Sequence, residues 1–175
     1  MRMSSLRSVC ERRLAGIPVP QPFDLRAFAE VVADYRGRPV HIHELPGLDG
    51  TDGFTGAWLP KAEEDVIFID ADASGWHKSA IGAHEFAHLL CDHQESARPL
   101  KELFKRLMPD LGDEALRRML GRHGRYTVAE EREAEMTACL ILDRADADPL
   151  PAWYPGPPGI AGRLAHVLRH PVRHG

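Results

Sequence analysis

The sequence contains few cysteines, no long apolar run and no dense cluster of basic residues, and each absence excludes a class of protein. The 3 cysteines are an odd number at wide spacings, which fits neither a disulfide framework nor a CxxC zinc pair. No apolar run approaches the roughly 18 residues that a membrane-spanning helix needs. Because the net charge is -4 and the middle of the chain is acidic, we expect no broad phosphate-binding face and no direct binding to nucleic acid.

What is present is the composition of an ordinary soluble domain. The 175 residues suit one domain, and 43% hydrophobic with 27% charged residues is close to the globular average. The isolated cysteines favour the reducing cytoplasm, although the acid-poor, Arg- and Ser-containing start of the chain resembles a transit peptide in composition. We expect one domain over residues 1–175, with its core at about 24–145. A helix at 4–15 and a Pro- and Gly-rich C-terminal tail with a weak helix are expected as appendages.

The order of the expected elements indicates an α+β fold class. A helix is expected after Asp24, where apolar residues recur at helical spacing until Gly37. Three strands, separated by Gly- and Pro-containing turns, are expected at residues 40–45, 54–59 and 66–70. They predict a small, mostly antiparallel sheet.

Two longer helices are expected after the sheet. The first covers residues 78–92 and is largely apolar, so we expect it to be buried. The second covers residues 127–143 and begins with Thr127 and Glu130 at the spacing of a capping box. Between them, residues 98–120 are amphipathic but interrupted by Pro and Gly, which predicts one or two lid-like helices over the core.

The first of these helices contains HEFAH at residues 84–88, which matches the HExxH pattern. His84 and His88 lie four residues apart and share one helix face, where both imidazoles can bind one Zn²⁺ at about 2.0–2.1 Å. Zinc lowers the pKa of water towards 7, and the adjacent Glu85 can take the proton of that water and pass it to a leaving amine. The pattern therefore predicts hydrolysis of an amide bond. The alternative is a pair of structural histidines that hydrogen bonds satisfy.

A third zinc ligand must come from elsewhere in the chain. The HExxHxxGxxH pattern would place a histidine at position 94, but that residue is Gln94, and we interpret His93 as a solvated residue at the helix end. The other common arrangement adds a glutamate from a second helix, and the segment EEREAE at 130–135 supplies candidates. The alternative for this segment is a solvated acidic first turn, which the helix macrodipole favours.

Helical geometry separates these glutamates from one another. Glu131 lies in line with the apolar face of its helix and is the preferred ligand, whereas Glu133 points about 110° away from the centre of that face. Glu130 belongs to the cap. Glu135, one turn beyond Glu131, is expected to accept the second ring N–H of a ligating histidine and so to fix its tautomer.

The segment HEFAHLL, followed about forty residues later by EEREAEMTACLIL, resembles the ImmA/IrrE family of HExxH metallopeptidase-like proteins. The pattern of this family is HExxH and then ExxxN/D within a buried, Ala-rich helix. The resemblance covers roughly residues 40–143. It implies one zinc ion held by His84, His88 and Glu131, with Glu85 as general base.

The same resemblance implies a compact zincin-like domain of the gluzincin type, with a small sheet beside the HExxH helix. Glu135 stands where the family has Asn or Asp, and Asp143-Arg144 stand where it commonly has Met-Pro. In zincins the substrate adds as an extended strand along the sheet edge beside the metal. By that analogy residues 54–59 or 66–70 form the edge, and the alternative is that both segments are core strands.

The tetrahedral oxyanion of amide hydrolysis needs a stabilising side chain, and spacing alone does not identify it. Tyr126, five residues before Glu131, is the preferred residue, with packing or surface exposure as the alternative. Tyr35, His77 and His123 are further alternatives.

Together these observations predict a cytoplasmic zinc-dependent endopeptidase that acts on a regulatory protein in trans, because the chain shows no helix-turn-helix of its own. Members of the resembling family are associated with cleaving or relieving a DNA-binding repressor, often in stress-response settings, and some belong to toxin-antitoxin-like pairs. The alternative function is a non-catalytic zinc-binding protein of the regulatory or toxin-antitoxin type. A third interpretation is a metal-free helical domain. Neither a membrane nor nucleic acid is expected as a partner.

Overall fold

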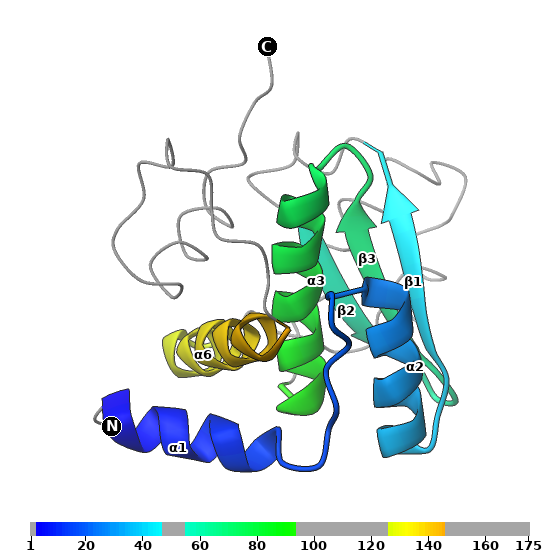
Figure 1. Ribbon diagram of the computed structural model, residues 1–175. Coiled ribbons are helices and arrows are strands. Elements are labelled where there is room, and N and C mark those ends of the chain that lie inside the picture. The colour runs from blue at the N-terminus through cyan, green and yellow to red at the C-terminus, as the bar shows by residue number, and fades with distance from the viewer. Residues whose placement is uncertain (1–2, 47–54, 94–125, 146–175) are drawn as a thin grey trace.

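The computed structural model describes residues 3–46, 55–93 and 126–145, which form four helices and a three-stranded sheet (Figure 1). In chain order the elements are α1 (Met3–Arg13), α2 (Leu25–Arg36), β1 (Val40–Leu45), β2 (Gly56–Pro60), β3 (Asp65–Asp70), α3 (Gly75–Leu90) and α6 (Val128–Arg144). The α+β class is confirmed. The lid expected at 98–120 and the C-terminal tail lie outside the described residues. Within the described ranges, no helix combines the length and the apolarity that crossing a bilayer requires.

The sheet has the strand order β1-β3-β2, with β1 parallel and β2 antiparallel to the central strand β3. The expectation of a mostly antiparallel sheet is therefore wrong for β1. A tight turn forces antiparallel pairing only on the two strands that it joins. That condition holds for β2 and β3, where the Lys61 N–H donates to the Glu64 carbonyl at 2.9 Å. Residues 46–55 separate β1 from β2, which is too long a connection to force these two strands to pair.

The strands differ in burial according to their place in the sheet. β3 is buried at every position, and β2 is buried along its centre. Helix α3 packs against these two strands, while α2 packs against β1 (Figure 1). Residues 66–70 thus belong to the central strand and cannot be the substrate edge. Among the described strands β2 pairs only with β3, so its outer side is the edge beside α3.

Helix α1 belongs to the core and is not an appendage. Its Leu6 and Cys10, and Leu14 directly after it, recur every four residues and are buried in the same apolar cluster as Phe86 of α3 and Ile141 of α6. Helix α6 packs against both α3 and α1 (Figure 1). The core boundary expected at about residue 24 is therefore too late.

Helix α3 begins after the cap residue Ser74 and ends in a tight turn. Asp92 adopts a φ of 50°, and its N–H donates to the Leu89 carbonyl at 3.2 Å. The next N–H, that of His93, donates to the His88 carbonyl at 3.1 Å. This pair of bonds is a Schellman motif, in which a residue in the left-handed conformation turns the chain back over the last helical turn. His93 is consequently directed towards α3 and not away from it.

Helix α6 begins with the capping box that the sequence predicts. The Thr127 side chain accepts from the Glu130 N–H at 3.2 Å, and the Glu130 carboxylate accepts from the Thr127 N–H at 2.6 Å. These reciprocal bonds fix the first turn of the helix. They thereby fix the direction in which the next side chain, that of Glu131, leaves the backbone.

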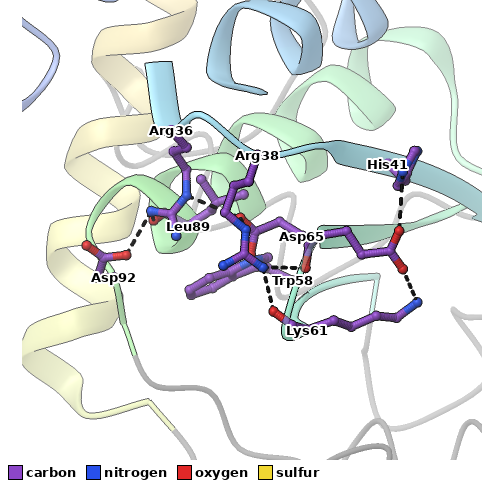
Figure 2. Close-up of polar contacts among 9 residues, drawn as sticks. Arg36, Arg38, His41, Trp58, Lys61, Asp65, Leu89 and Asp92 are labelled. Atoms are coloured by element: carbon purple, nitrogen blue, oxygen red, sulfur yellow. Dashed lines mark hydrogen bonds and ion pairs between the residues drawn. The ribbon is translucent and has the colours of Figure 1, made fainter. Parts of the chain in front are cut away.

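Asp65, at the start of β3, is the centre of a buried polar network (Figure 2). Its fully buried carboxylate accepts from Arg36 at 3.1 Å and from the Trp58 indole at 3.0 Å, and it pairs with Arg38 at 3.2 Å. Arg36 also donates to the Leu89 carbonyl at 3.1 Å. Removing one partner from such a buried network costs about 3–5 kcal/mol. The network holds the end of α2 and the start of β3 against the last turn of α3.

Candidate metal centre

His84 and His88 lie on one face of α3, and their Nε2 atoms are 3.0 Å apart. Both rings are buried. Glu131 approaches them from the first turn of α6, with its Oε2 atom 3.5 Å from His84 Nε2 and 3.9 Å from His88 Nε2. The structure therefore brings together, from two helices, the three side chains that the sequence analysis selected.

The separations of these donor atoms suit a small divalent cation. Two ligands at about 2.0–2.1 Å from a tetrahedral zinc ion lie about 3.3 Å from each other. The observed separations of 3.0, 3.5 and 3.9 Å lie on both sides of that value. Two imidazole nitrogens and one carboxylate are also a common donor set of catalytic zinc sites. The residues present thus fit a zinc ion.

The two imidazoles differ in their electrostatic surroundings. Burial lowers the pKa of His84, but the contact with Glu131 and the charge of Glu85 outweigh it, so this pKa lies above its ordinary value. The pKa of His88 is lowered by burial and by the neighbouring rings of His84 and His93. The His88 ring is thus neutral in the metal-free protein, and a neutral ring has one nitrogen available to a cation.

The carboxyl group of Glu85 lies against strand β2. A Cβ atom on Gly56 would come within 3.0 Å of Glu85 Oε1 and within 2.5 Å of the Ile81 side chain, so glycine is what leaves room for this carboxyl group. Burial raises the pKa of Glu85 to about 7, although the charge of His84 and a backbone hydrogen bond from Trp58 both act to lower it. A carboxyl group with this pKa accepts and releases a proton near neutral pH.

Tyr126 lies just before α6 and stacks on His88, with the ring centroids 3.6 Å apart and the ring planes inclined by 10°. This contact brings the preferred oxyanion residue to the predicted site. Of the alternatives, Tyr35 is 58% exposed on α2 and His77 is buried in the first turn of α3. His123 lies outside the described residues.

The remaining ring nitrogens are not held as the sequence predicts. The Nδ1 atom of His84 is buried without a hydrogen-bond partner in the described part of the chain, so Glu135 does not accept from it. The charge of Glu135 nevertheless acts to raise the pKa of His84. The Nδ1 atom of His88 faces the Nδ1 atom of His93 at 3.0 Å. The interpretation of His93 as solvated is wrong, because the turn at Asp92 buries its ring, which is 5% exposed.

Glu133, which the helical geometry set aside, also contacts this region. Its Oε2 atom lies 3.4 Å from His93 Nε2, and its Oε1 atom lies 3.3 Å from the Arg13 guanidinium on α1. The Glu133 side chain, which points away from the apolar face of α6, thus points towards α1. Together with Cys91, these residues form a second group, Cys91, His93 and Glu133, whose donor atoms lie within 4.8 Å of one another. Burial raises the pKa of the Cys91 thiol to about 11, so the thiol is protonated at neutral pH.

Two sequence signals point to residues that the motif analysis missed. A glycine inside a strand often marks the close approach of another group, as Gly56 does for the Glu85 carboxyl group. An aspartate directly after a helical segment can adopt the left-handed conformation that ends the helix, as Asp92 does. No comparable local signal identifies Glu133, because its contact depends on the packing of α1 against α6.

A comparison of the chain with family models, with curated proteins and with solved structures finds no match. The chemistry of the site is therefore inferred from the residues and their geometry.

Proposed function

We propose that this chain is a zinc-dependent endopeptidase of the HExxH class, with His84, His88 and Glu131 as the zinc ligands. The observation that carries the proposal is the convergence of these three donors from α3 and α6 at separations of 3.0, 3.5 and 3.9 Å. A small sheet beside the HExxH helix is also the arrangement expected of a zincin-like domain of the gluzincin type.

Glu85 is the proposed general base. When bound, a zinc ion polarises a carbonyl group and lowers the pKa of water towards 7. Glu85 takes the proton of the attacking water and delivers it to the leaving amine. In the metal-free protein burial raises the pKa of this carboxyl group to about 7, and its place beside His84 on α3 puts it next to the proposed metal ligands. The phenol of Tyr126, whose ring stacks on His88, is the proposed hydrogen-bond donor to the oxyanion.

The substrate is proposed to bind as an extended strand along the outer edge of β2. The Asp70 N–H donates to the Thr55 carbonyl at 2.9 Å, which sets the register of the bonds between β3 and β2. Because bonded and non-bonded pairs alternate along an antiparallel ladder, the backbone groups of Gly56 and Trp58 point away from β3. The Trp58 N–H is bonded to the Glu85 carboxyl group, so a substrate strand would pair with the Trp58 carbonyl and with Gly56. These two residues also lie beside Glu85. A strand paired with β2 would therefore pass the proposed base.

A regulatory protein, such as a DNA-binding repressor, is the proposed substrate. This part of the proposal follows from the resemblance of residues 84–90 and 130–142 to ImmA/IrrE proteins. Strand pairing requires unpaired backbone groups, so the cleaved segment must be exposed and extended. A partner without such a segment would bind without being cleaved, which corresponds to the alternative of a non-catalytic zinc-binding interaction protein.

Cleavage of a mixed-sequence peptide library, read by mass spectrometry of new amino termini, tests the proposal. Wild-type protein loaded with zinc should retain one zinc ion and cleave. Glu85→Gln should retain the zinc ion and cleave at least about 100-fold more slowly, because the general base is lost. The matched control Glu30→Gln changes an exposed glutamate on α2 and should behave as wild type.

Equal cleavage by wild type and Glu85→Gln would contradict the proposed mechanism. Zinc retention without cleavage of any library member would support the interaction protein. A wild-type chain that retains no zinc would overturn both functions.

A further inference from the structure

A continuous row of side chains leads from the HExxH histidines to helix α1. His88 Nδ1 lies 3.0 Å from His93 Nδ1, and His93 Nε2 lies 3.4 Å from Glu133 Oε2. The other oxygen of Glu133 lies 3.3 Å from Arg13. His88 and His93 are almost completely buried, while Arg13 is one-third exposed. The row thus begins in the interior and ends at the surface.

The backbone determines the position of His93 in this row. The left-handed turn at Asp92 and the bond from the His93 N–H to the His88 carbonyl place the His93 ring beside the last turn of α3. From the opposite side, Glu133 holds the far nitrogen of the ring. A ring held at both nitrogens has little freedom to rotate.

Hydrogen-bond accounting assigns the protons along the row. A neutral imidazole has one N–H donor and one acceptor nitrogen. If His88 Nε2 binds a cation, its proton must be on Nδ1, which then donates to His93 Nδ1. The proton of His93 must in turn be on Nε2, where the Glu133 carboxylate accepts it. Arg13 supplies the positive charge that this carboxylate needs in a largely buried position.

The same accounting opposes a second cation at Cys91, His93 and Glu133. A cation on His93 Nε2 would move the His93 proton to Nδ1, and His88 Nδ1 would have to accept it. His88 would then carry its own proton on Nε2, the atom that faces His84 and Glu131. With both rings neutral, a cation on His93 Nε2 therefore excludes a cation on His88 Nε2.

We propose that His93, held by Glu133 and Arg13, is a positioning residue that keeps the proton of His88 on Nδ1 and leaves His88 Nε2 free to bind zinc. This inference rests on the proposed zinc site. Partners that fix the orientation and tautomer of a ligating histidine typically contribute 10- to 100-fold to metal affinity.

Zinc affinity, measured by competition with a chromophoric chelator, tests the role of His93. His93→Leu removes the acceptor and should weaken zinc binding about 10- to 100-fold. His93→Asn places an amide oxygen on Cγ, where Nδ1 stood, and should retain most of the affinity. The matched control His43→Leu removes an exposed histidine from β1 and should bind as wild type. Circular dichroism and melting of the metal-free proteins show whether each variant is folded.

Glu133→Leu provides a second variant, which leaves His93 in place but removes the acceptor of its Nε2 proton. It should also weaken zinc binding about 10-fold or more. Equal affinity of the wild type, His93→Leu and Glu133→Leu would overturn the role of His93 while leaving the zinc site intact. Equal losses in His93→Leu and His93→Asn would show a packing effect and would overturn it too. Absence of zinc from the wild type would instead overturn the zinc site itself.

Cobalt substitution distinguishes this role from a second metal site. Cobalt bound to His84, His88 and Glu131 has only nitrogen and oxygen ligands, so its spectrum should contain no thiolate charge-transfer band. A thiolate band that Cys91→Ala removes would place the cation on the Cys91 group and overturn the proposal. The Cys91 thiol contacts the Thr137 hydroxyl at 3.8 Å, which agrees with a protonated, uncoordinated sulfur.

Discussion

Two clusters at α3 contain similar ligand atoms but differ in the surroundings of their carboxylates. The Glu131 side chain is 43% exposed, and its ion-pair partners among the described residues are the two HExxH imidazoles. Glu133 lies between the ring of His93 and the guanidinium of Arg13. The first carboxylate has its charge available for a cation, whereas the second is already neutralised by an arginine.

This difference shows that residue types and spacing do not define a metal site on their own. Within each cluster the donor atoms lie within 4.8 Å of one another. Counter-charges and proton positions separate them, because a cation needs an unpaired negative charge and an unprotonated nitrogen. In our proposal the HExxH cluster offers both, and His93 of the neighbouring cluster positions the ring of His88.

Removing one ligand from each cluster should give the largest contrast. His84→Ala should abolish stoichiometric zinc binding and the increase in melting temperature that zinc gives, because the proposed ion would connect α3 with α6. Cys91→Ala should retain one zinc ion per chain. Metal analysis after gel filtration and melting curves with and without zinc measure both effects. Loss of zinc in Cys91→Ala with retention in His84→Ala would place the zinc ion on the Cys91 group and not on the HExxH histidines.

The stability of the metal-free protein should depend on pH through Glu85. Burial raises its pKa in the folded state to about 7, above the ordinary value of 4.5, so folding favours the protonated form. The stability from this group is fully present below pH 4.5 and is lost as the pH rises through 7. Glu85→Gln stays neutral and should exceed the wild type by up to about 3 kcal/mol at pH 8.

Urea denaturation in EDTA at pH 5 and pH 8 measures this effect. The advantage of Glu85→Gln should be clearly smaller at pH 5, where the wild-type carboxyl group is mostly protonated in the folded state. The exposed variant Glu30→Gln serves as control and should show no such change. A constant difference between Glu85→Gln and the wild type at the two pH values would show that Glu85 is not desolvated in the folded protein.

The smallest effect on zinc affinity is expected at Arg13, the surface end of the row of side chains that leads to His88. Arg13→Gln removes the counter-charge of Glu133 but leaves the contact between Glu133 and His93 in place. Because Arg13 is one-third exposed, we expect zinc affinity to fall less than about 10-fold. Arg12→Gln, at the exposed neighbouring position, is the matched control. A larger loss of zinc affinity in Arg13→Gln than in His93→Leu would contradict the proposal that Arg13 acts on His88 through Glu133 and His93.

Local sequence signals predicted most of the elements. The helix after Asp24, the capping box at Thr127 and the three strands all follow from caps, periodicity and turns, which act within a few residues. The parallel pairing of β1 with β3 was not predictable in this way. It depends on which strands become neighbours in the sheet, which strand patterns do not encode.

The same limit applies to the candidate site. The positions of His84, His88 and Glu131 follow from the four-residue spacing and from the apolar face of one helix, so helical geometry was sufficient. The burial of His93 does not follow from local signals, because an aspartate, and not the usual glycine, ends α3 in the left-handed conformation. Helical geometry alone directs Glu133 away from the apolar face of α6, and its contact with Arg13 depends on the packing of α1, which that geometry does not include.

We propose that one zinc ion binds between α3 and α6. Anomalous X-ray diffraction at the zinc absorption edge, from crystals of the zinc-loaded full chain, tests it most directly. We expect one anomalous peak, about 2.0–2.1 Å from His84 Nε2, His88 Nε2 and a Glu131 oxygen. A peak on the Cys91 group, or no peak near the HExxH histidines, would contradict it.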